Sequence, residues 1–165
     1  MDKINYKELK KIVSSIDSKN KKVVDVGSKD FNGSCRDLFP NSTYIGVDVQ
    51  SGNNVDVVMS NEFEIPLLHE HADIVVCTSV LEHCRNPFIL MSEMVRILKP
   101  FGYIIIAVPQ KWGLHDFPHD YWRINPDGLR ELFMISNIRE QNIWTHNQIT
   151  IRHGILKMTY GVGIK

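Results

Sequence analysis

Two positions in the N-terminal half carry residue types suited to binding a polar ligand. Gly27 and Ser28 directly follow the apolar run 23–26, and a glycine there lets the backbone turn sharply and approach a ligand closely. Asp48 ends a second apolar run, 44–48, and its carboxylate can accept both hydroxyls of a ribose. Each position alone also fits a plain strand-to-helix turn or a solvated aspartate. The two together favour a ligand site.

The residues after Gly27 restrict the chemistry of this ligand. A dinucleotide-binding turn repeats glycine in the pattern G-x-G-x-x-G, because a pyrophosphate needs close approach of the backbone. Here Lys29 and Asn32 occupy the positions of the second and third glycines of that pattern, Phe31 lies between them, and Gly33 follows. A ligand without phosphates therefore fits this turn better than a dinucleotide.

The segment 115–123 is the second candidate for chemistry. It holds two histidines, two aspartates, a tyrosine and an arginine within an expected loop at 112–125. One interpretation is a substrate pocket, with His115 or His119 as general base and Arg123 orienting an anionic group. The other is a lid that is held in place by Asp–Arg pairing and aromatic packing. The sequence leaves both open.

Aromatic side chains in the same region could stack on a planar or sugar-like ligand, or could pack the lid itself. They are Trp112, Phe117, Tyr121 and Trp122. Histidines with intervening carboxylates could also bind a metal ion. We expect no metal, because nothing else in the chain supplies a ligand set of the zinc type. The pair His69 and His71 is expected in a solvated loop.

Apolar runs that alternate with amphipathic segments indicate the scaffold that positions these residues. We expect strands at 23–26, 44–48, 55–59, 73–77, 103–108, 138–145 and 155–164, and helices at 6–16, 34–39, 87–98 and 126–134. This order indicates an α/β fold, a doubly wound and mostly parallel sheet with helices on both faces. Ligands of such sheets bind beyond the carboxyl ends of the strands, where Gly27, Asp48 and the segment 115–123 fall.

Composition restricts the class of protein further. The chain has 165 residues, enough for one domain with its own core. Its 19 basic and 19 acidic side chains balance, which argues against a protein built around a basic nucleic-acid-binding face. Cys35, Cys77 and Cys84 form no CxxC pair and are expected as free thiols in a reducing compartment. Since no apolar run suggests a signal peptide or a membrane span, we expect a cytoplasmic protein.

Five segments occur in an order that is more specific than any of them alone. They are VVDVGS at 23–28, YIGVD at 44–48, ADIVVCTSVLEH at 72–83, MVRILKP at 94–100 and YIIIAVP at 103–109. In this order they resemble the class I, seven-stranded S-adenosylmethionine-dependent methyltransferases of the group often called type 11. The later segments HDYWR at 119–123 and PDGL at 126–129 also resemble members of that group.

The resemblance implies a fold and a cofactor. The fold would be a seven-stranded sheet with its last strand antiparallel, in a single methyltransferase domain over 1–165 with an N-terminal helix within 1–20 and a substrate-side loop or lid at 110–125. The methyl donor would be S-adenosylmethionine. The implied donor-binding residues are Asp25, Gly27, Ser28, Gly33, Asp48, Val49, Asn61, Thr78, Ser79 and His83.

Several of these residues carry a specific implied role. Gly27 and Ser28 would contact the methionyl part of the donor, and Asp48 would bind the ribose. Val49 would pack on the adenine, and the amide oxygen of Asn61 would accept a hydrogen bond from the adenine amino group. For His83, a structural histidine that closes a loop is an open alternative.

One departure from the family pattern concerns the turn after Pro100. The family usually has two glycines there, whereas this chain has Phe101 before Gly102. A positive φ at Phe101 would be costly. We therefore expect a different type of turn at this position.

The implied activity is methyl transfer to an O or N atom of an unidentified acceptor by in-line displacement, with His119 or His115 as base. Tyr121, Trp122 and Arg123 would contact the substrate. A non-catalytic scaffold or partner subunit with the same fold is the main alternative. A nicotinamide-dependent dehydrogenase is disfavoured by the missing third glycine.

Expectations about partners follow from the same residues. The acceptor would be a small molecule, with a sugar-like one compatible with the aromatic side chains. We expect no membrane partner and no clear nucleic-acid-binding face. The sequence shows no inserted cap domain, so the site would be open to a large acceptor or completed by a homodimer.

Overall fold

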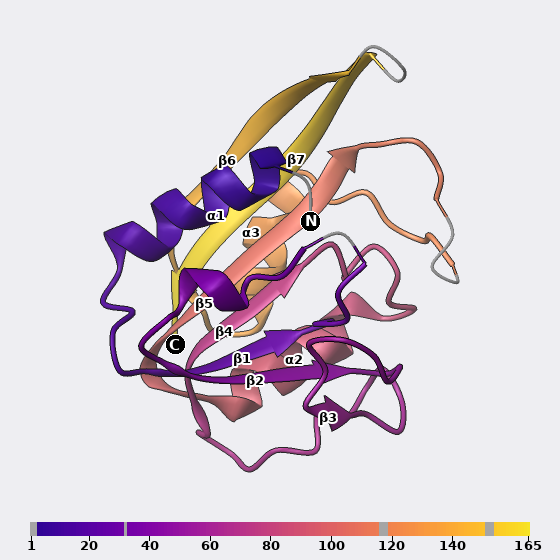
Figure 1. Ribbon diagram of the computed structural model, residues 1–165. Helices are drawn as coiled ribbons and strands as arrows, with labels where there is room; N and C mark the ends of the chain where they lie inside the picture. Colours follow the sequence, from indigo (N-terminus) through magenta and orange to yellow (C-terminus); the bar gives the residue numbers. More distant parts are fainter. Residues whose placement is uncertain (1–2, 32, 116–118, 151–153) are drawn as a thin grey trace.

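The computed structural model describes residues 3–31, 33–115, 119–150 and 154–165. In this part of the chain, seven strands form one sheet in the order β3-β2-β1-β4-β5-β7-β6 (Figure 1). The strands are β1 (Lys22–Val26), β2 (Thr43–Asp48), β3 (Val57–Val58), β4 (Ala72–Thr78), β5 (Leu98–Lys111), β6 (Arg139–Thr150) and β7 (Gly154–Ile164). The helices are α1 (Lys3–Ser15), α2 (Pro87–Ile97) and α3 (Pro126–Ile135).

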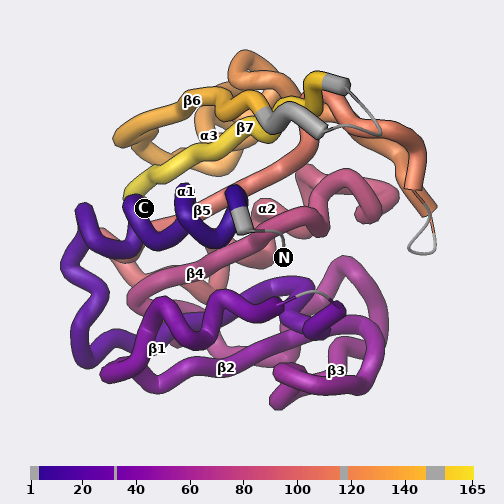
Figure 2. Tube along the Cα trace, turned by 45° about the horizontal axis from the view of Figure 1, so that its top comes forward, coloured from indigo at the N-terminus to yellow at the C-terminus, as the bar shows by residue number. Residues whose placement is uncertain are grey.

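The direction of the strands confirms the predicted fold class. Strands β1 to β5 pair in parallel with their neighbours, whereas β7 runs antiparallel to both β5 and β6. Figure 2 shows the strands following one another from β3 and β2 at one side to β7 and β6 at the other. All carboxyl ends of β1, β2, β4 and β5 therefore share one edge of the sheet.

Helices cover both faces of the sheet because its strands are apolar on both sides. Leu9 and Ile12 of α1 pack against one face, which includes Val23 of β1. Met91 of α2 and Phe133 of α3 belong to a separate cluster on the opposite face. Figure 1 shows α1 in front of the sheet and α2 and α3 behind it.

Both helices behind the sheet begin with an asparagine cap followed by proline. Asn86 Oδ1 accepts from the backbone N–H of Phe88 at 3.2 Å, and Asn125 Oδ1 accepts from that of Gly128 at 2.8 Å. The prolines that follow, Pro87 and Pro126, need no such partner because they have no N–H. These caps fix where the segments after β4 and β5 end.

Two elements are shorter than the sequence predicted. The helix expected at 34–39 is only a three-residue 3-10 helix, Arg36–Leu38. The Ser34 hydroxyl accepts from the Arg36 backbone N–H at 2.9 Å, and Pro40 follows too soon for an α-helical nucleus to form. The strand expected at 55–59 is reduced to the two residues of β3.

The expectation for the turn at Phe101 is wrong. Phe101 has a φ of 63°, so it takes the left-handed conformation that was judged too costly. Its side chain is 83% exposed, and its N–H donates to the carbonyl of Lys165 at 2.9 Å. Gly102 is needed for space, because a Cβ there would lie 2.6 Å from Leu98 Cδ1. The hydrogen bond to the C-terminal residue compensates part of the strain at Phe101.

Among the described residues, no helix is long and apolar enough to cross a bilayer.

Candidate functional site

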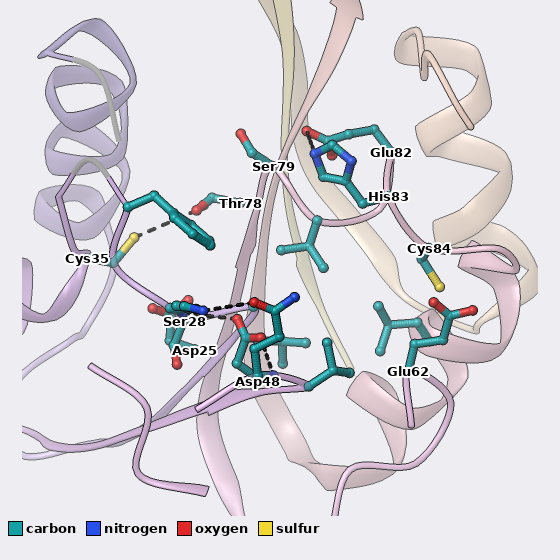
Figure 3. A pocket seen from close by; sticks show the side chains of 18 of the residues that line it. Asp25, Ser28, Cys35, Asp48, Glu62, Thr78, Ser79, Glu82, His83 and Cys84 are labelled. Carbon is teal, nitrogen blue, oxygen red and sulfur yellow. Dashed lines mark hydrogen bonds and ion pairs between the residues drawn. The ribbon is translucent and has the colours of Figure 1, made fainter. Parts of the chain in front are cut away.

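A cavity of about 630 Å³ opens at the carboxyl edge of the sheet, where the sequence predicts the ligand site. This volume lies in the range of pockets that hold small molecules and cofactors. Its walls come from the turns after β1, β2 and β4, from the end of β5 and from the segment that follows. Figure 3 shows Asp25, Ser28 and Asp48 at one side of it, and Glu82 and His83 at another.

The turn after β1 requires glycine for two independent reasons. Gly27 has a φ of 77°, a conformation that side chains with a Cβ rarely adopt. A Cβ at Gly27 would also lie 2.1 Å from Val80 Cγ2, far inside van der Waals contact. The N–H groups of Gly27 and Ser28 both donate to the carbonyl of Val47, at 2.8 and 3.1 Å. These bonds tie the turn to β2.

The Ser28 hydroxyl lies in this turn as a buried polar group. Ser28 is 4% exposed and lines the cavity. Its Oγ has no hydrogen-bond partner among the described residues. A buried hydroxyl without a partner is costly, so this group is suited to a ligand that brings one.

Backbone hydrogen bonds hold the carboxylate of Asp48 at the cavity wall. Oδ2 accepts from the Lys29 N–H at 3.0 Å, and Oδ1 accepts from the Gln50 N–H at 2.9 Å. A carboxylate has about four acceptor positions, so each oxygen keeps one for a ligand hydroxyl. Val49, the next residue, is 46% exposed and lines the same wall with an apolar surface.

Asp25 lies deeper, beneath the turn. It is 4% exposed, and burial raises the pKa of its carboxyl to about 7, although the Tyr44 hydroxyl donates to it at 2.6 Å. Arg36 lies over the Tyr44 ring, with its Cζ 4.7 Å from the ring centroid. Asp25 is therefore an acceptor at the base of the cavity whose charge depends on pH near neutrality.

The end of β4 turns sharply into the cavity. Ser79 adopts a φ of 56° and donates its N–H to the carbonyl of Ala107 at 2.8 Å. Such strain in a residue with a Cβ is typical of functional sites. Thr78, just before it, lies with its Oγ1 4.0 Å from the thiol of Cys35 (Figure 3). Both Thr78 and Ser79 line the cavity.

Glu82, His83 and His115 form a cluster at the other side of the cavity. Glu82 is 1% exposed, and burial raises the pKa of its carboxyl to about 8. His83 Nε2 lies 3.8 Å from Glu82 Oε1 (Figure 3). The ring of His115 meets the ring of His83 edge to face, with centroids 4.9 Å apart. Burial lowers the pKa of His83, so its neutral form predominates near pH 7.

An ion pair between Asp120 and Arg123 organises the segment after β5. Arg123 donates to both carboxylate oxygens of Asp120, at 2.5 and 2.6 Å, and to the carbonyls of Trp112 and Gly113, at 3.2 and 2.9 Å. The Arg123 guanidinium lowers the pKa of Asp120, whose side chain is 1% exposed. These bonds, with the His115 N–H that donates to Asp120 Oδ2, tie residues 119–123 to residues 112–115.

Backbone bonds attach this loop to the turn after β4. The carbonyl of Glu82 accepts from the N–H groups of Tyr121 and Trp122, at 2.7 and 3.2 Å. The indole N–H of Trp122 donates to the carbonyl of Cys84 at 2.9 Å. Residues 121 and 122 are thus docked on the turn after β4, whose residues Glu82 and Cys84 line the cavity.

Comparison with known proteins explains this arrangement. Residues 27–106 match a family described as a methyltransferase domain. The chain has the fold of a class I methyltransferase. S-adenosylmethionine is the cofactor of this class, and the seven-stranded sheet with its antiparallel β7 is the predicted fold. A comparison with curated proteins found no match.

Solved structures of methyltransferases share this fold at low sequence identity. A 1,6-didemethyltoxoflavin-N1-methyltransferase from Burkholderia thailandensis, solved with S-adenosylhomocysteine, has a TM-score of 0.77 and 15% identity over 99% of this chain and 79% of its own. A SAM-dependent methyltransferase from Methanosarcina mazei has a TM-score of 0.74 and 13% identity, over 93% of this chain and 96% of its own. A complex of the Haloferax volcanii Trm112 methyltransferase activator with a methyltransferase is also similar. Its TM-score is 0.69 and its sequence identity is 15%, over 94% of this chain and 88% of that chain.

The cavity brings together most of the site residues that the sequence singled out. The predicted residues that line it are Asp25, Gly27, Ser28, Gly33, Asp48, Val49, Thr78, Ser79, His83 and His115. Other predicted residues, His119, Tyr121, Trp122 and Arg123, belong to the docked loop and are not among the lining residues. Residues 32 and 116–118, which include the aromatic candidate Phe117, lie outside the described residues.

Asn61 also lies off the cavity wall. Its Oδ1 accepts from the Phe63 N–H at 2.8 Å, and its Nδ2 donates to Ser60 Oγ at 3.2 Å. The residue that lines the cavity here is Glu62, one position later. The turn between β3 and β4 thus presents a neighbouring side chain, which the family resemblance alone could not resolve.

Glu82 is the main site residue that sequence reasoning missed. It stands in the Leu81-Glu82-His83 segment, which was used only to recognise the family. A signal was available in the sequence. Glu82 directly precedes His83 just after an expected strand, and an acidic residue in that place is a candidate partner for the histidine. Its proximity to His115 depends on how the loop folds, and spacing does not show that.

Proposed function

We propose that this methyltransferase transfers a methyl group from S-adenosylmethionine to an O or N atom of a small acceptor. The observation that carries the proposal is the pairing of the Gly27 turn with the Asp48 carboxylate in one cavity. It offers a ligand close approach to the backbone, a hydroxyl-binding carboxylate and no cradle of glycines for phosphate. S-adenosylmethionine has a ribose and no phosphate, so it matches this wall.

The donor would be held along the wall formed by β1 and β2. Asp48 would accept hydrogen bonds from the ribose hydroxyls, and Val49 would pack on the adenine. The unpartnered Ser28 Oγ would bond to the methionyl part, close to Gly27. Thr78 and Ser79, at the end of β4, would then lie beside the sulfonium and its methyl group.

Methyl transfer itself is an in-line displacement at this sulfonium. The acceptor atom forms a bond to the methyl carbon while the C–S bond breaks, and the electron pair stays on sulfur as S-adenosylhomocysteine leaves. Because the donor supplies the electrophile, the protein contributes alignment, exclusion of water and removal of the acceptor's proton. Trp112 and His115, which follow β5 and line the cavity, would contribute to the exclusion of water.

We propose that the acceptor's proton is removed by the cluster of Glu82, His83 and His115. The part of the cavity wall that this cluster forms is called the lid side. His115 lines the cavity, whereas His119 is not among the lining residues and is exposed. His119 instead offers its backbone carbonyl to His83 Nδ1 at 2.6 Å. This arrangement favours His115 over His119 as the group nearest the acceptor.

The proposal is tested by labelled methyl transfer. The protein is incubated with S-adenosylmethionine carrying a labelled methyl group and with pools of small hydroxyl- and amine-bearing metabolites, and labelled products are separated. The proposal is supported if wild type makes a labelled product that Asp48→Ala does not make. A protein that binds S-adenosylmethionine but labels no product in any pool would favour the partner-subunit alternative, and binding of NADH in its place would favour the dehydrogenase.

A further inference from the structure

Three potential metal ligands meet at the lid side of the cavity. Glu82 and His83 follow β4, and His115 follows β5, so two separate loops supply them. One ligand atom from each lies within 4.8 Å of the others. Ligand atoms at about 2.1 Å from a tetrahedral ion lie about 3.4 Å apart, so small side-chain rotations would complete the set.

The hydrogen bond of His83 selects the ring nitrogen that faces the carboxylate. A carbonyl oxygen can only accept, so Nδ1–H of His83 donates to the carbonyl of His119 at 2.6 Å. In the neutral ring Nε2 is then the unprotonated nitrogen, and it lies 3.8 Å from Glu82 Oε1. Metal-binding histidines are commonly held in this way by a carbonyl on the second nitrogen.

His115 is held by the same kind of contact. Its Nδ1 lies 3.1 Å from the carbonyl of Gly113 and 3.2 Å from Asp120 Oδ2. Asp120 is fixed in turn by Arg123 and by the His115 backbone N–H, which donates to it at 2.9 Å. A carboxylate that orients an imidazole and raises its basicity is the usual second partner of a metal-binding histidine.

Glu82 supplies an independent indication of a missing ligand. Its side chain is 1% exposed, lines the cavity, and has an Oε2 without any hydrogen-bond partner among the described residues. A buried carboxyl oxygen without a partner calls for an explanation, and an unoccupied ion position is one. Burying a carboxylate is strongly unfavourable unless it is paired or binds a metal ion.

We propose that Glu82, His83 and His115 bind a divalent transition-metal ion at the lid side of the cavity. Two imidazoles and one carboxylate are a ligand set of catalytic zinc sites, in which a further position remains for water or substrate. The sequence-based expectation of no metal weighed His115 and His119 along the chain. It left out Glu82 and His83, which approach His115 only in the folded protein.

The ion deepens the proposed function, on which this step rests, by selecting an oxygen acceptor. A hydroxyl of the acceptor would occupy the open position and would lose its proton to water more easily than when free. The resulting oxygen would attack the methyl carbon of S-adenosylmethionine, and the electron pair of the broken C–S bond would stay on sulfur. His115 would then serve as a ligand, and no histidine base would be needed because the ion lowers the pKa of the bound hydroxyl and water takes the proton.

The metal site is tested by calorimetric titration of chelator-treated protein with ZnCl₂ and, separately, with MnCl₂, in the absence of S-adenosylmethionine. One ion should bind per chain. Glu82→Gln and His115→Asn should each weaken binding by more than about 100-fold, the upper end of the loss seen when only an outer partner is removed. His69→Asn, which changes an exposed histidine outside the cluster, should bind as wild type does.

Glu82→Gln keeps the size of the side chain, so it separates loss of a ligand from loss of the fold. Circular dichroism should match that of wild type without metal, and the midpoint of thermal unfolding should be no lower. Absence of binding of both ions to wild type would overturn the inference. So would equal binding by Glu82→Gln, His115→Asn and wild type.

Failure of this inference and failure of the proposed function give different results. Labelled methyl transfer that persists at full rate in excess EDTA, in a protein that binds neither ion, rejects the metal site and leaves the methyltransferase proposal intact. Stoichiometric metal binding by a protein that does not bind S-adenosylmethionine supports the metal site and rejects the donor site.

Discussion

Replacing Gly27 by alanine tests whether the donor turn depends on glycine as the geometry requires. The substitution introduces two separate penalties. Alanine at a φ of 77° is strained by about 1–2 kcal/mol. The new Cβ would lie 2.1 Å from Val80 Cγ2, and overpacking of this kind costs about 1–3 kcal/mol. The free energy of unfolding should therefore fall by about 2–5 kcal/mol.

A double-mutant cycle separates the two penalties. Val80→Ala removes both γ-methyl groups that the new Cβ would meet, at 2.1 and 3.1 Å, and leaves the backbone conformation as it is. The unfolding free energies of wild type, Gly27→Ala, Val80→Ala and the double variant are measured in urea. The coupling energy should be favourable by about 1–3 kcal/mol, because the steric part is relieved and the conformational part remains.

Gly113→Ala is the matched control, since nothing lies within 4 Å of a Cβ at that position. Its unfolding free energy should stay within about 0.5 kcal/mol of wild type. If Gly27→Ala is no more destabilising than Gly113→Ala, the account of the turn is wrong. Zero coupling to Val80→Ala would reject the steric part alone.

Four further predictions concern the site. Asp48→Ala should weaken binding of S-adenosylmethionine by about 10- to 100-fold in calorimetry, because charged hydrogen bonds to the ribose are lost. The control Asp17→Ala, which changes an exposed aspartate, should bind as wild type does. Equal affinities of Asp48→Ala and wild type would contradict the role of Asp48. Arg123→Met should lower the free energy of unfolding in urea by about 3–5 kcal/mol at pH 7, since it leaves the buried Asp120 carboxylate without its partner, and a loss below about 1 kcal/mol would contradict the pairing. Because the folded-state pKa of Asp120 is lowered, the stabilisation by this pair should be present above the ordinary pKa of 3.8 and be lost as the pH falls below it; a wild-type advantage over Arg123→Met that persists undiminished in acid would argue against it. The folded-state pKa of Glu82 is raised from 4.5 to about 8, so its contribution to stability is complete below pH 4.5 and is lost as the pH rises to about 8. Urea unfolding of metal-free wild type should therefore give a free energy of unfolding that falls with pH across this range, and Glu82→Gln should reduce that fall. Identical pH dependences of the two proteins would refute the assignment.

Local rules predicted the features that depend on one strand and the turn after it. Gly27 and Asp48 were placed correctly at the cavity because parallel strands bring their carboxyl ends to one edge. The family resemblance added Thr78, Ser79 and His83, which follow β4 at that edge. The seven-stranded, mostly parallel sheet with its antiparallel last strand, β7, also agreed with the prediction.

Features that depend on contacts between distant segments were not predicted. Phe101 adopts a positive φ because its N–H meets the carbonyl of Lys165, a partner 64 positions later. Arg123 was a candidate for binding substrate, but the folded loop uses its guanidinium to hold Asp120. Likewise, the position of Glu82 beside His115 requires the loop after β5 to dock on the turn after β4. No periodicity or spacing in the sequence encodes these approaches.

The donor site is tested most directly by calorimetric titration of the wild-type protein with S-adenosylmethionine. The Gly27 turn, the unpartnered Ser28 hydroxyl and the fixed Asp48 carboxylate predict one binding site per chain, competition by S-adenosylhomocysteine and no binding of NADH. A protein that binds neither S-adenosylmethionine nor S-adenosylhomocysteine would contradict the account.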